Sequence, residues 1–297
     1  MQRISLKDDN DSDIYLNSNE LRDTFYSNSR KGNIFHVILN STGLLMQRDT
    51  ADGKTKDLLI HICDIVGGRC VWIQKPKRFG TTGTCGSCTT SVTEKHKYPD
   101  EVNEDAYLYI FAYVIKKNIR CTYRRERTVI TLRFRSFDSH EDNMREAEKW
   151  YKVLKTLRNN HFLLCNLQRV DSFEKKFSLS ETKRLLILLN PKSGSGKARE
   201  IFHQQVVPIL NEAEVVYDLH VTKHCQYAYD FVRLKNLAIW NGIAAIGGDG
   251  LFHEILNGLL NRYDWKTVVK NITLGIIPCG SGNGLARSIA HCFQYVL

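Results

Sequence analysis

The stretch Ile246-Gly247-Gly248-Asp249-Gly250 decides the fold of the second half of this chain. An apolar run over 242–246 leads into it, and residues 251–260 follow with the apolar spacing of a helix. Glycines after a strand let the backbone approach a ligand closely, and the start of a helix favours a phosphate group. Asp249 would lie at the end of the strand, where open α/β sheets bind their ligands. The stretch therefore predicts an anion-binding loop that carries one carboxylate, in the position of a catalytic base.

The same order of strand and helix repeats through residues 182–297. Apolar strands are expected at 183–189, 215–221, 242–246 and 272–277. Helices are expected at 198–210, 227–234 and 251–260, with a fourth opening after Gly284. Pro208 is expected to break or kink the first of these helices near its end. This alternation indicates an α/β fold with a doubly wound parallel sheet, the fold of a nucleotide-binding lobe.

Three of the four predicted strands lead into loops of glycine and small residues. These loops are Asn190-Pro-Lys-Ser-Gly-Ser-Gly-Lys197, Gly247-Gly-Asp-Gly250 and Pro278-Cys-Gly-Ser-Gly-Asn-Gly284. One such turn alone is more often structural, but loops that follow parallel strands meet at one edge of the sheet. Three converging loops, one with a carboxylate, predict a polyphosphate site. The loop at 190–197 is not a Walker A loop, because Pro191 stands in place of the first glycine and Ala198 follows the lysine. The loop at 280–284 does not match the dinucleotide-binding fingerprint.

The first half of the chain predicts a mainly-β domain. Residues 1–32 are polar and aperiodic and are interpreted as a disordered tail. Short β-type runs follow from residue 34, separated by turn signals, and a helix with an apolar stripe begins after Ser139. Several short strands closed by one helix with a buried tryptophan resemble a pleckstrin-homology domain over 33–158. Residues 159–181 are interpreted as a linker, and residues 182–297 as the nucleotide-binding domain.

The charge of the first half and the cysteine content indicate which binding partners and which cellular compartment to expect. Residues 1–180 carry 30 of the 42 lysines and arginines against 23 of the 32 acidic residues. This excess favours an anionic partner for the first half, either acidic lipid headgroups or nucleic acid, although a solvated basic face fits equally well. The cysteine count, 9, is odd, and several cysteines lie in apolar segments, which indicates a reduced intracellular protein.

Two polar motifs of the first half are candidate binding sites. Lys75-Pro-Lys-Arg78 and the loop at 80–91 could bind a phosphoinositide or another acidic headgroup, or could be an ordinary solvated loop. Cys85-Gly-Ser-Cys88 has the spacing of half a zinc site or of a redox pair. No second Cys/His pair with matching spacing follows it, so metal binding or redox function is not expected there, and the metal ligands of the chain stay unknown.

The three glycine-rich loops, with Leu251-Phe-His-Glu254 after the second, resemble the catalytic domain of the diacylglycerol kinase type. In detail they are most similar to sphingosine kinases, since Leu251 replaces the usual threonine of diacylglycerol kinases and Gly280-Ser-Gly-Asn283 is intact, unlike in ceramide kinases. The resemblance covers about residues 182–292. One departure is Gly247, where sphingosine kinases more often carry serine.

The resemblance implies an ATP- and Mg²⁺-dependent lipid kinase that phosphorylates the primary hydroxyl of sphingosine or sphinganine. Asp249 would accept the proton of that hydroxyl, and Gly247, Gly248 and Gly250 would lie beside it at the substrate. It implies a nucleotide-binding set of Asn190, Pro191, Lys192, Thr222, Gly247, Glu254, Gly280, Ser281 and Gly282. A sphingoid base and acidic membrane lipids are the expected partners, and no nucleic acid is expected. The expected localisation is cytoplasmic, with peripheral association with membranes.

Three alternatives stay open. Thr222 could merely cap the following segment, Lys192 could be a solvated loop charge, and Glu254 could simply favour the start of its helix. The acceptor could be ceramide, diacylglycerol or NAD instead of a long-chain base. The chain could also be a non-catalytic membrane-binding fragment, because the family's enzymes continue with a β-sandwich after the position of Leu297. We accordingly expect a C-terminally truncated kinase with weak or no activity of its own.

Overall fold

The computed structural model describes residues 20–26, 34–49, 55–72, 104–117, 123–167 and 184–293. The chain divides into two compact units, formed mainly by residues up to 173 and by residues 174–297. Lys75–Arg78, the loop at 80–91 and Cys85-Gly-Ser-Cys88 lie outside the described residues.

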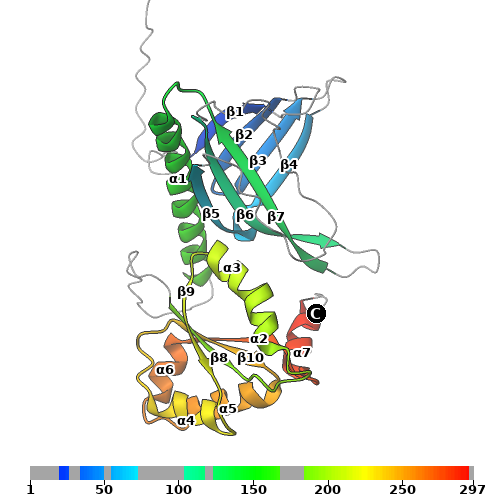
Figure 1. Cartoon of the computed structure of the whole chain (residues 1–297), viewed down its shortest axis with the longest axis vertical. Helices are drawn as coiled ribbons and strands as arrows, with labels where there is room; N and C mark the ends of the chain where they lie inside the picture. The colour runs from blue at the N-terminus through cyan, green and yellow to red at the C-terminus, as the bar shows by residue number, and fades with distance from the viewer. Residues whose placement is uncertain are drawn as a thin grey trace, which may run out of the picture. The chain divides into compact units, whose positions relative to one another are not determined.

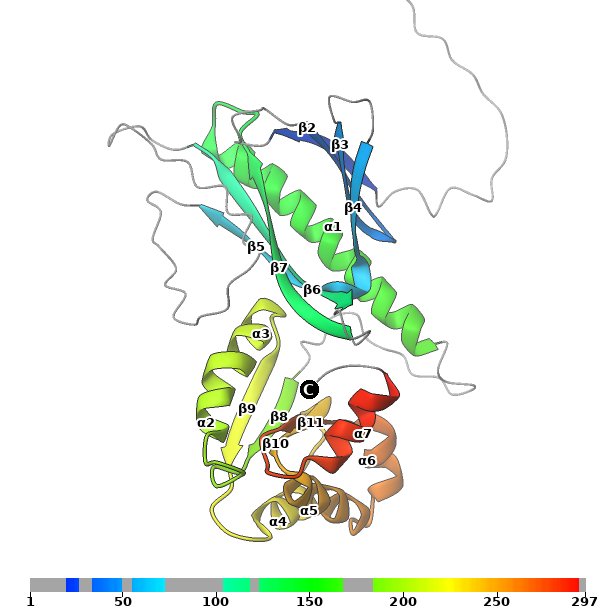
Figure 2. The ribbon, with the colours of Figure 1, turned by 90° about the vertical axis from the view of Figure 1, so that its right-hand side faces the viewer.

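The first unit contains two antiparallel sheets and one long helix (Figure 2). The four-stranded sheet has the order β1 (Leu21–Tyr26), β2 (Ile34–Asn40), β3 (Gly43–Asp49) and β4 (Thr55–His61). A 3₁₀ turn, η1 (Ile62–Asp64), leads to the three-stranded sheet of β5 (Ile65–Trp72), β6 (Ala106–Lys117) and β7 (Tyr123–Phe134). The helix α1 (His140–Leu167) follows the last strand.

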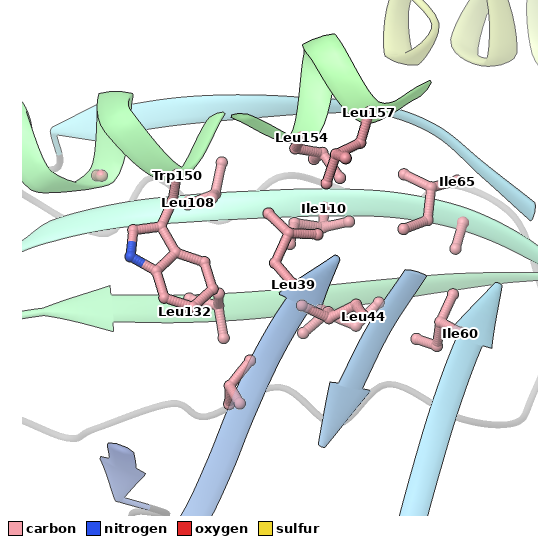
Figure 3. Packing of buried hydrophobic residues seen from close by; sticks show 14 of the residues in the cluster. Leu39, Leu44, Ile60, Ile65, Leu108, Ile110, Leu132, Trp150, Leu154 and Leu157 are labelled. Carbon is pink, nitrogen blue, oxygen red and sulfur yellow. The ribbon is translucent and has the colours of Figure 1, made fainter. Parts of the chain in front are cut away.

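The core of this unit forms where α1 packs on the sheets. Trp150, Leu154 and Leu157 occur at helical spacing and are buried against inward-facing strand residues such as Leu108 and Leu39 (Figure 3). Strand residues alternate in burial along β6, as expected for a strand with one buried face. Burying a large apolar side chain stabilises a fold by about 1.5–3 kcal/mol, so this cluster holds helix and sheets together.

Two predicted boundaries of the first half are wrong. Residues 21–26 were expected to belong to a disordered tail, but they form β1, paired antiparallel with β2 from Leu21–Leu39 to Tyr26–Ile34. Packing of the Phe25 ring explains why these residues form a strand. The ring lies edge-on to those of Phe134 and Trp150, with centroid distances of 5.5 Å and 5.8 Å. The predicted linker 159–181 is also wrong in part, since α1 continues to Leu167 and no proline or glycine interrupts it.

The second unit is built on a parallel four-stranded sheet. Its strands are β8 (Arg184–Leu189), β9 (Val216–Val221), β10 (Gly242–Gly247) and β11 (Thr273–Pro278). They have the spatial order β11-β10-β8-β9, and each neighbouring pair is parallel. The predicted α/β parallel sheet is therefore confirmed.

Helices cover both faces of this sheet (Figure 1). Ile187, Leu189 and Ile246 point to one face, which is covered by a helical segment with buried Phe202 and Val206. This segment consists of α2 (Ala198–Ile201), a π turn η2 (Phe202–Val206) and α3 (Val207–Glu212). The π turn ends two residues before Pro208, which cannot donate a hydrogen bond to the preceding turn, so the helix is widened there and then continues.

The opposite face of the sheet is covered by α4 (Tyr227–Leu234) and α5 (Asp249–Leu260). A helix that was not predicted, α6 (Trp265–Asn271), follows α5, and α7 (Gly284–Cys292) follows β11. Successive side chains of β8 and β10 point to opposite faces and are buried on both, which agrees with the prediction of a doubly wound sheet. No helix in the described part of the chain is long and apolar enough to cross a membrane.

Candidate functional site

The strand order of the second unit creates a topological switch point between β8 and β10. From β8 the chain crosses to β9 on one side, and from β9 it returns to β10 on the other side of β8. The connections from β8 and β10 therefore leave the sheet in opposite directions, which opens a crevice at the carboxyl ends of these two strands. Ligands of open α/β sheets bind in this crevice.

A cavity of about 320 Å³ lies at this position. Its lining comes from the loops after β8, β10 and β11, and it contains one carboxylate, that of Asp249. The lining residues are Asn190, Ser193, Gly194, Gly248, Asp249, Gly250, Leu251, Gly280, Ser281, Gly282 and Asn283. Three loops that are far apart in the sequence thus converge, as the glycine pattern predicted.

The glycines of these loops allow the three backbones to touch. A Cβ atom on Gly280 would lie 2.5 Å from Cα of Gly248, and one on Gly194 would lie 2.4 Å from the carbonyl oxygen of Cys279. Gly194 also has a φ of +55°, a conformation that side chains with a Cβ atom rarely adopt. The loops are joined further by a 2.9 Å hydrogen bond that Cys279 N–H donates to the carbonyl of Gly247. Side chains in place of Gly194 and Gly280 would therefore prevent the loops from approaching one another this closely.

Asp249 lies between the N-terminal ends of two helices. It is the first residue of α5, and its carboxylate accepts hydrogen bonds from the backbone N–H groups of Gly284 at 2.7 Å and Leu285 at 3.1 Å, at the start of α7. The side chain is exposed toward the cavity that it lines. The N-terminal ends of both helices, with their partial positive charge, therefore face this carboxylate.

Asn283 closes the loop after β11 just before α7 begins. Its backbone is left-handed, with a φ of +53°. Its side-chain oxygen accepts the N–H of Gly280 at 2.8 Å, and its amide group donates to the carbonyl of Gly280. The loop that contains Ser281 and Gly282 is therefore held at both of its ends.

The structure brings most of the predicted site residues together at the cavity. Seven of them line it, namely Asn190, Gly248, Asp249, Gly250, Gly280, Ser281 and Gly282. Pro191 and Lys192 follow Asn190 directly but are not part of the lining, although the side-chain oxygen of Asn190 accepts the N–H of Lys192 at 3.0 Å. Their predicted roles toward a nucleotide stay predictions.

Three further predicted residues lie away from the cavity lining. Thr222 follows β9 at the edge of the sheet, where its N–H donates to Leu189 at 2.8 Å. Glu254 accepts the N–H of Ala228 at 3.3 Å, which places its carboxylate at the start of α4. Gly247 is buried, and a Cβ atom there would lie 3.0 Å from the hydroxyl oxygen of Ser193. A serine at 247 would therefore require the side chains of Leu251 and Ser193 to shift.

Ser193, Gly194, Leu251 and Asn283 also line the cavity, although they are not among the individual residues predicted for the site. For Asn283 a signal existed, because asparagine is among the few residues that tolerate the left-handed conformation, and here it precedes a helix. Ser193 is buried, and its position depends on the turn in which its N–H donates to the carbonyl of Asn190 at 3.2 Å. Only the folded loop shows that turn.

The cavity fits a polyphosphate better than a metal cluster. Backbone loops without side chains can approach phosphate oxygens, and two helix ends contribute partial positive charge. No cluster of three or more histidine, cysteine or acidic side chains occurs among the residues that the structure describes. Cys279 is not a candidate nucleophile, because burial raises the pKa of its thiol and keeps it protonated.

Comparisons with known proteins agree with this geometry. Residues 184–292 match the family model of the diacylglycerol kinase catalytic domain. Human sphingosine kinase 1 is 43% identical over 112 residues, which cover 38% of this chain and 29% of that protein. Sphingosine kinase 1 of Arabidopsis thaliana is 39% identical over 112 residues, which cover 38% of this chain and 23% of that protein.

One relative matches a longer part of the chain. Human sphingosine kinase 2 is 35% identical over 185 residues, which cover 62% of this chain and 27% of that protein. A match of this length is longer than the second unit, so it includes residues of the first unit. The matched parts span less than a third of the length of these curated relatives. Residues 184–292 of this chain therefore match the model of the diacylglycerol kinase catalytic domain, and the chain is similar in sequence to sphingosine kinases.

Proposed function

We propose that this protein is an ATP-dependent lipid kinase that phosphorylates the primary hydroxyl of sphingosine or sphinganine. The observation that carries the proposal is the position of Asp249, the one carboxylate in the lining of a glycine-rich cavity at the switch point of the sheet. The family of residues 184–292 and their similarity to sphingosine kinases support the choice of reaction and acceptor.

The proposed chemistry uses two parts of the cavity, the backbones of its glycines and the carboxylate of Asp249. Phosphoryl transfer depends mainly on positioning and on stabilising negative charge. The backbones of Gly248, Gly280 and Gly282 would hold the phosphates of ATP, because a loop without side chains can approach them closely. Asp249 would accept the proton of the acceptor hydroxyl as its oxygen attacks the γ-phosphorus.

The carboxylate is prepared for that step by its two backbone donors. Gly284 and Leu285 fix the direction of both carboxylate oxygens, yet each oxygen has a further lone pair for the hydroxyl proton. After transfer the proton stays on Asp249 until solvent removes it, and the exposure of Asp249 provides the route. The new phosphate ester leaves with the acceptor, and ADP is released from the loops.

Magnesium would bind mainly through the nucleotide. Mg²⁺ prefers phosphate oxygens and water together with one or two carboxylates, and Asp249 is the single carboxylate in the cavity lining. Bound there, Mg²⁺ would neutralise phosphate charge. Asn190 and Ser193 provide neutral oxygen atoms at the same cavity.

The test is a pair of substitutions in the whole chain. Asp249→Asn keeps the size of the side chain and an acceptor oxygen but removes the base, so phosphorylation of sphingosine should fall by about 100- to 10,000-fold. Asp230→Asn on the exposed side of α4 is the matched control and should keep the wild-type rate. Turnover of Asp249→Asn near the wild-type rate would show that the base is wrongly assigned.

A panel of acceptors decides between related substrates. With radiolabelled ATP, sphingosine and sphinganine should be phosphorylated in preference to ceramide, diacylglycerol and NAD. Preference for ceramide or diacylglycerol would keep the kinase chemistry but replace the acceptor. Binding of ATP to the chain, measured by calorimetry, tests the nucleotide site even where turnover is slow.

The first unit supports a second role at membranes. We propose that it is a pleckstrin-homology-like domain, since it has sheets of four and three antiparallel strands followed by one helix. Arg124 and Arg125, exposed at the start of β7, are cationic groups that suit acidic lipid headgroups, and we propose with them a cytoplasmic protein that associates peripherally with membranes. The variant Arg124→Gln/Arg125→Gln should sediment less with phosphatidylserine vesicles than the wild type. Equal sedimentation would contradict this role.

A further inference from the structure

We propose that Asn283 is a positioning residue that couples the nucleotide loop 280–282 to the carboxylate of Asp249. The inference rests on the proposed function, because it assigns to Asn283 the task of aligning the base with the bound phosphates. Asn283 lines the cavity, but the described contacts of its side chain are with the loop backbone.

The backbone of Asn283 sets the start of α7. Its φ of +53° turns the chain sharply between the loop and the helix, and Asn283 is the N-cap residue of α7. Left-handed backbone is costly for most residues, while asparagine tolerates it. The next two residues, Gly284 and Leu285, are the donors that bind the carboxylate of Asp249.

The side chain of Asn283 fixes the other end of the loop. One amide group both accepts the N–H of Gly280 at 2.8 Å and donates to its carbonyl. Gly280 in turn packs directly against the loop after β10, since a Cβ atom on it would lie 2.5 Å from Cα of Gly248. Asp249 follows Gly248 in the chain.

These contacts form a closed path around the cavity. It runs from Gly248 to Gly280 by packing, from Gly280 to Asn283 by two hydrogen bonds, and from the first turn of α7 back to Asp249. A phosphate that occupies the loop 280–282 cannot move it without moving the start of α7. Occupation of the nucleotide loop therefore sets the direction of the carboxylate that receives the acceptor proton.

Two substitutions separate the backbone role of Asn283 from its side-chain role. Asn283→Ala loses the amide group and also has to place an alanine in left-handed backbone. Asn283→Gly loses the amide group but accepts the left-handed backbone without strain. Glu214, with a φ of +54°, is left-handed outside the cavity, so Glu214→Ala and Glu214→Gly are matched controls.

The kinetic readout compares kcat with thermal stability. Because a small misplacement of a catalytic group is costly, kcat should fall by about 10- to 100-fold in both Asn283 variants, with KM for sphingosine unchanged. Asn283→Gly should recover the Tm that Asn283→Ala loses without recovering kcat. The Glu214 pair should change Tm alone. If Asn283→Gly regains wild-type kcat together with Tm, Asn283 serves the backbone only and the proposal is wrong.

A second readout does not depend on turnover. In the wild type, Mg²⁺ and a non-hydrolysable ATP analogue should shift the backbone amide resonances of Gly284 and Leu285. The shift should be reduced in Asn283→Gly at saturating nucleotide, and an unchanged shift would contradict the coupling. If Asp249→Asn keeps full activity, the assignment of the base fails, while this nucleotide response of Leu285 still reports whether Asn283 couples the loop to α7.

Discussion

The carboxylate of Asp249 and the backbone N–H of Gly284 are joined by a 2.7 Å hydrogen bond, so the expected catalytic base also holds the first turn of α7. The two residues are 35 positions apart in the chain and begin the helices that follow the neighbouring strands β10 and β11. A change at Asp249 should therefore affect stability as well as chemistry, and the two effects can be separated.

Replacement of Asp249 by alanine should lower the free energy of unfolding by about 1 kcal/mol, because the N-terminus of α7 loses its acceptor. Asp249→Asn keeps one acceptor oxygen and should lose less. Urea denaturation of both variants measures the difference. Equal stability of Asp249→Ala and the wild type would show that this contact does not hold α7.

The pair Gly247 and Ser193 should be coupled. Gly247→Ser places a Cβ atom 3.0 Å from the Ser193 hydroxyl oxygen and 2.9 Å from a methyl carbon of Leu251, so it should cost about 1–3 kcal/mol. The double variant Gly247→Ser/Ser193→Gly relieves the first contact and should regain at least about 1 kcal/mol. A thermodynamic cycle from urea denaturation tests this, and simple additivity of the two substitutions would contradict it.

The ion pair of Asp218 and Arg184 should make stability depend on pH in the acid range. Hydrogen bonds from Arg184, above all, and from Trp240 lower the pKa of Asp218 below its ordinary 3.8 against the opposing effect of burial. With a lowered pKa in the folded state, this stabilisation is complete above pH 3.8 and is lost as the pH falls through the folded value.

Asp218→Asn should accordingly be less stable at neutral pH and should lose stability less steeply below pH 3.8 than the wild type. The urea midpoint measured across this range gives the two slopes. Asp230→Asn, on the exposed side of α4, is the control and should follow the wild-type curve. Parallel curves for Asp218→Asn and the wild type would contradict the role of the pair.

Cysteine reactivity tests the packing of both units. Burial and the nearby charge of Glu148 raise the pKa of Cys70 from 9.0 to about 11, which makes its thiolate fraction at pH 8 roughly 100-fold smaller. Burial also raises the pKa of Cys279. Iodoacetamide should therefore label the exposed Cys225 and Cys292 well before Cys70 and Cys279, as followed by mass spectrometry. Early labelling of Cys70 would show that β5 is less well packed than described.

Much of the second unit could be predicted because its patterns are local. The runs that became β8, β10 and α4 are continuous in the chain, and their apolar spacing is set by the period of a strand or a helix. The extra helix α6 was missed because it buries none of its side chains completely, so its sequence shows no strong stripe. In the first half, β1 was not predicted because its residues are held in place by packing against the distant ring of Trp150.

By itself, the sequence determined that three glycine-rich loops follow strands of one parallel sheet and that Asp249 is the carboxylate among them, because parallel strands place their carboxyl ends at one edge. Only the tertiary structure decided which residues reach the cavity. It placed Glu254 at the start of α4 and brought Asn283 and Ser193 to the lining. The physical reason is that hydrogen bonds between distant loops, such as those of Gly284 and Leu285 with Asp249, have no period in the chain and form only when the sheet has aligned its strands.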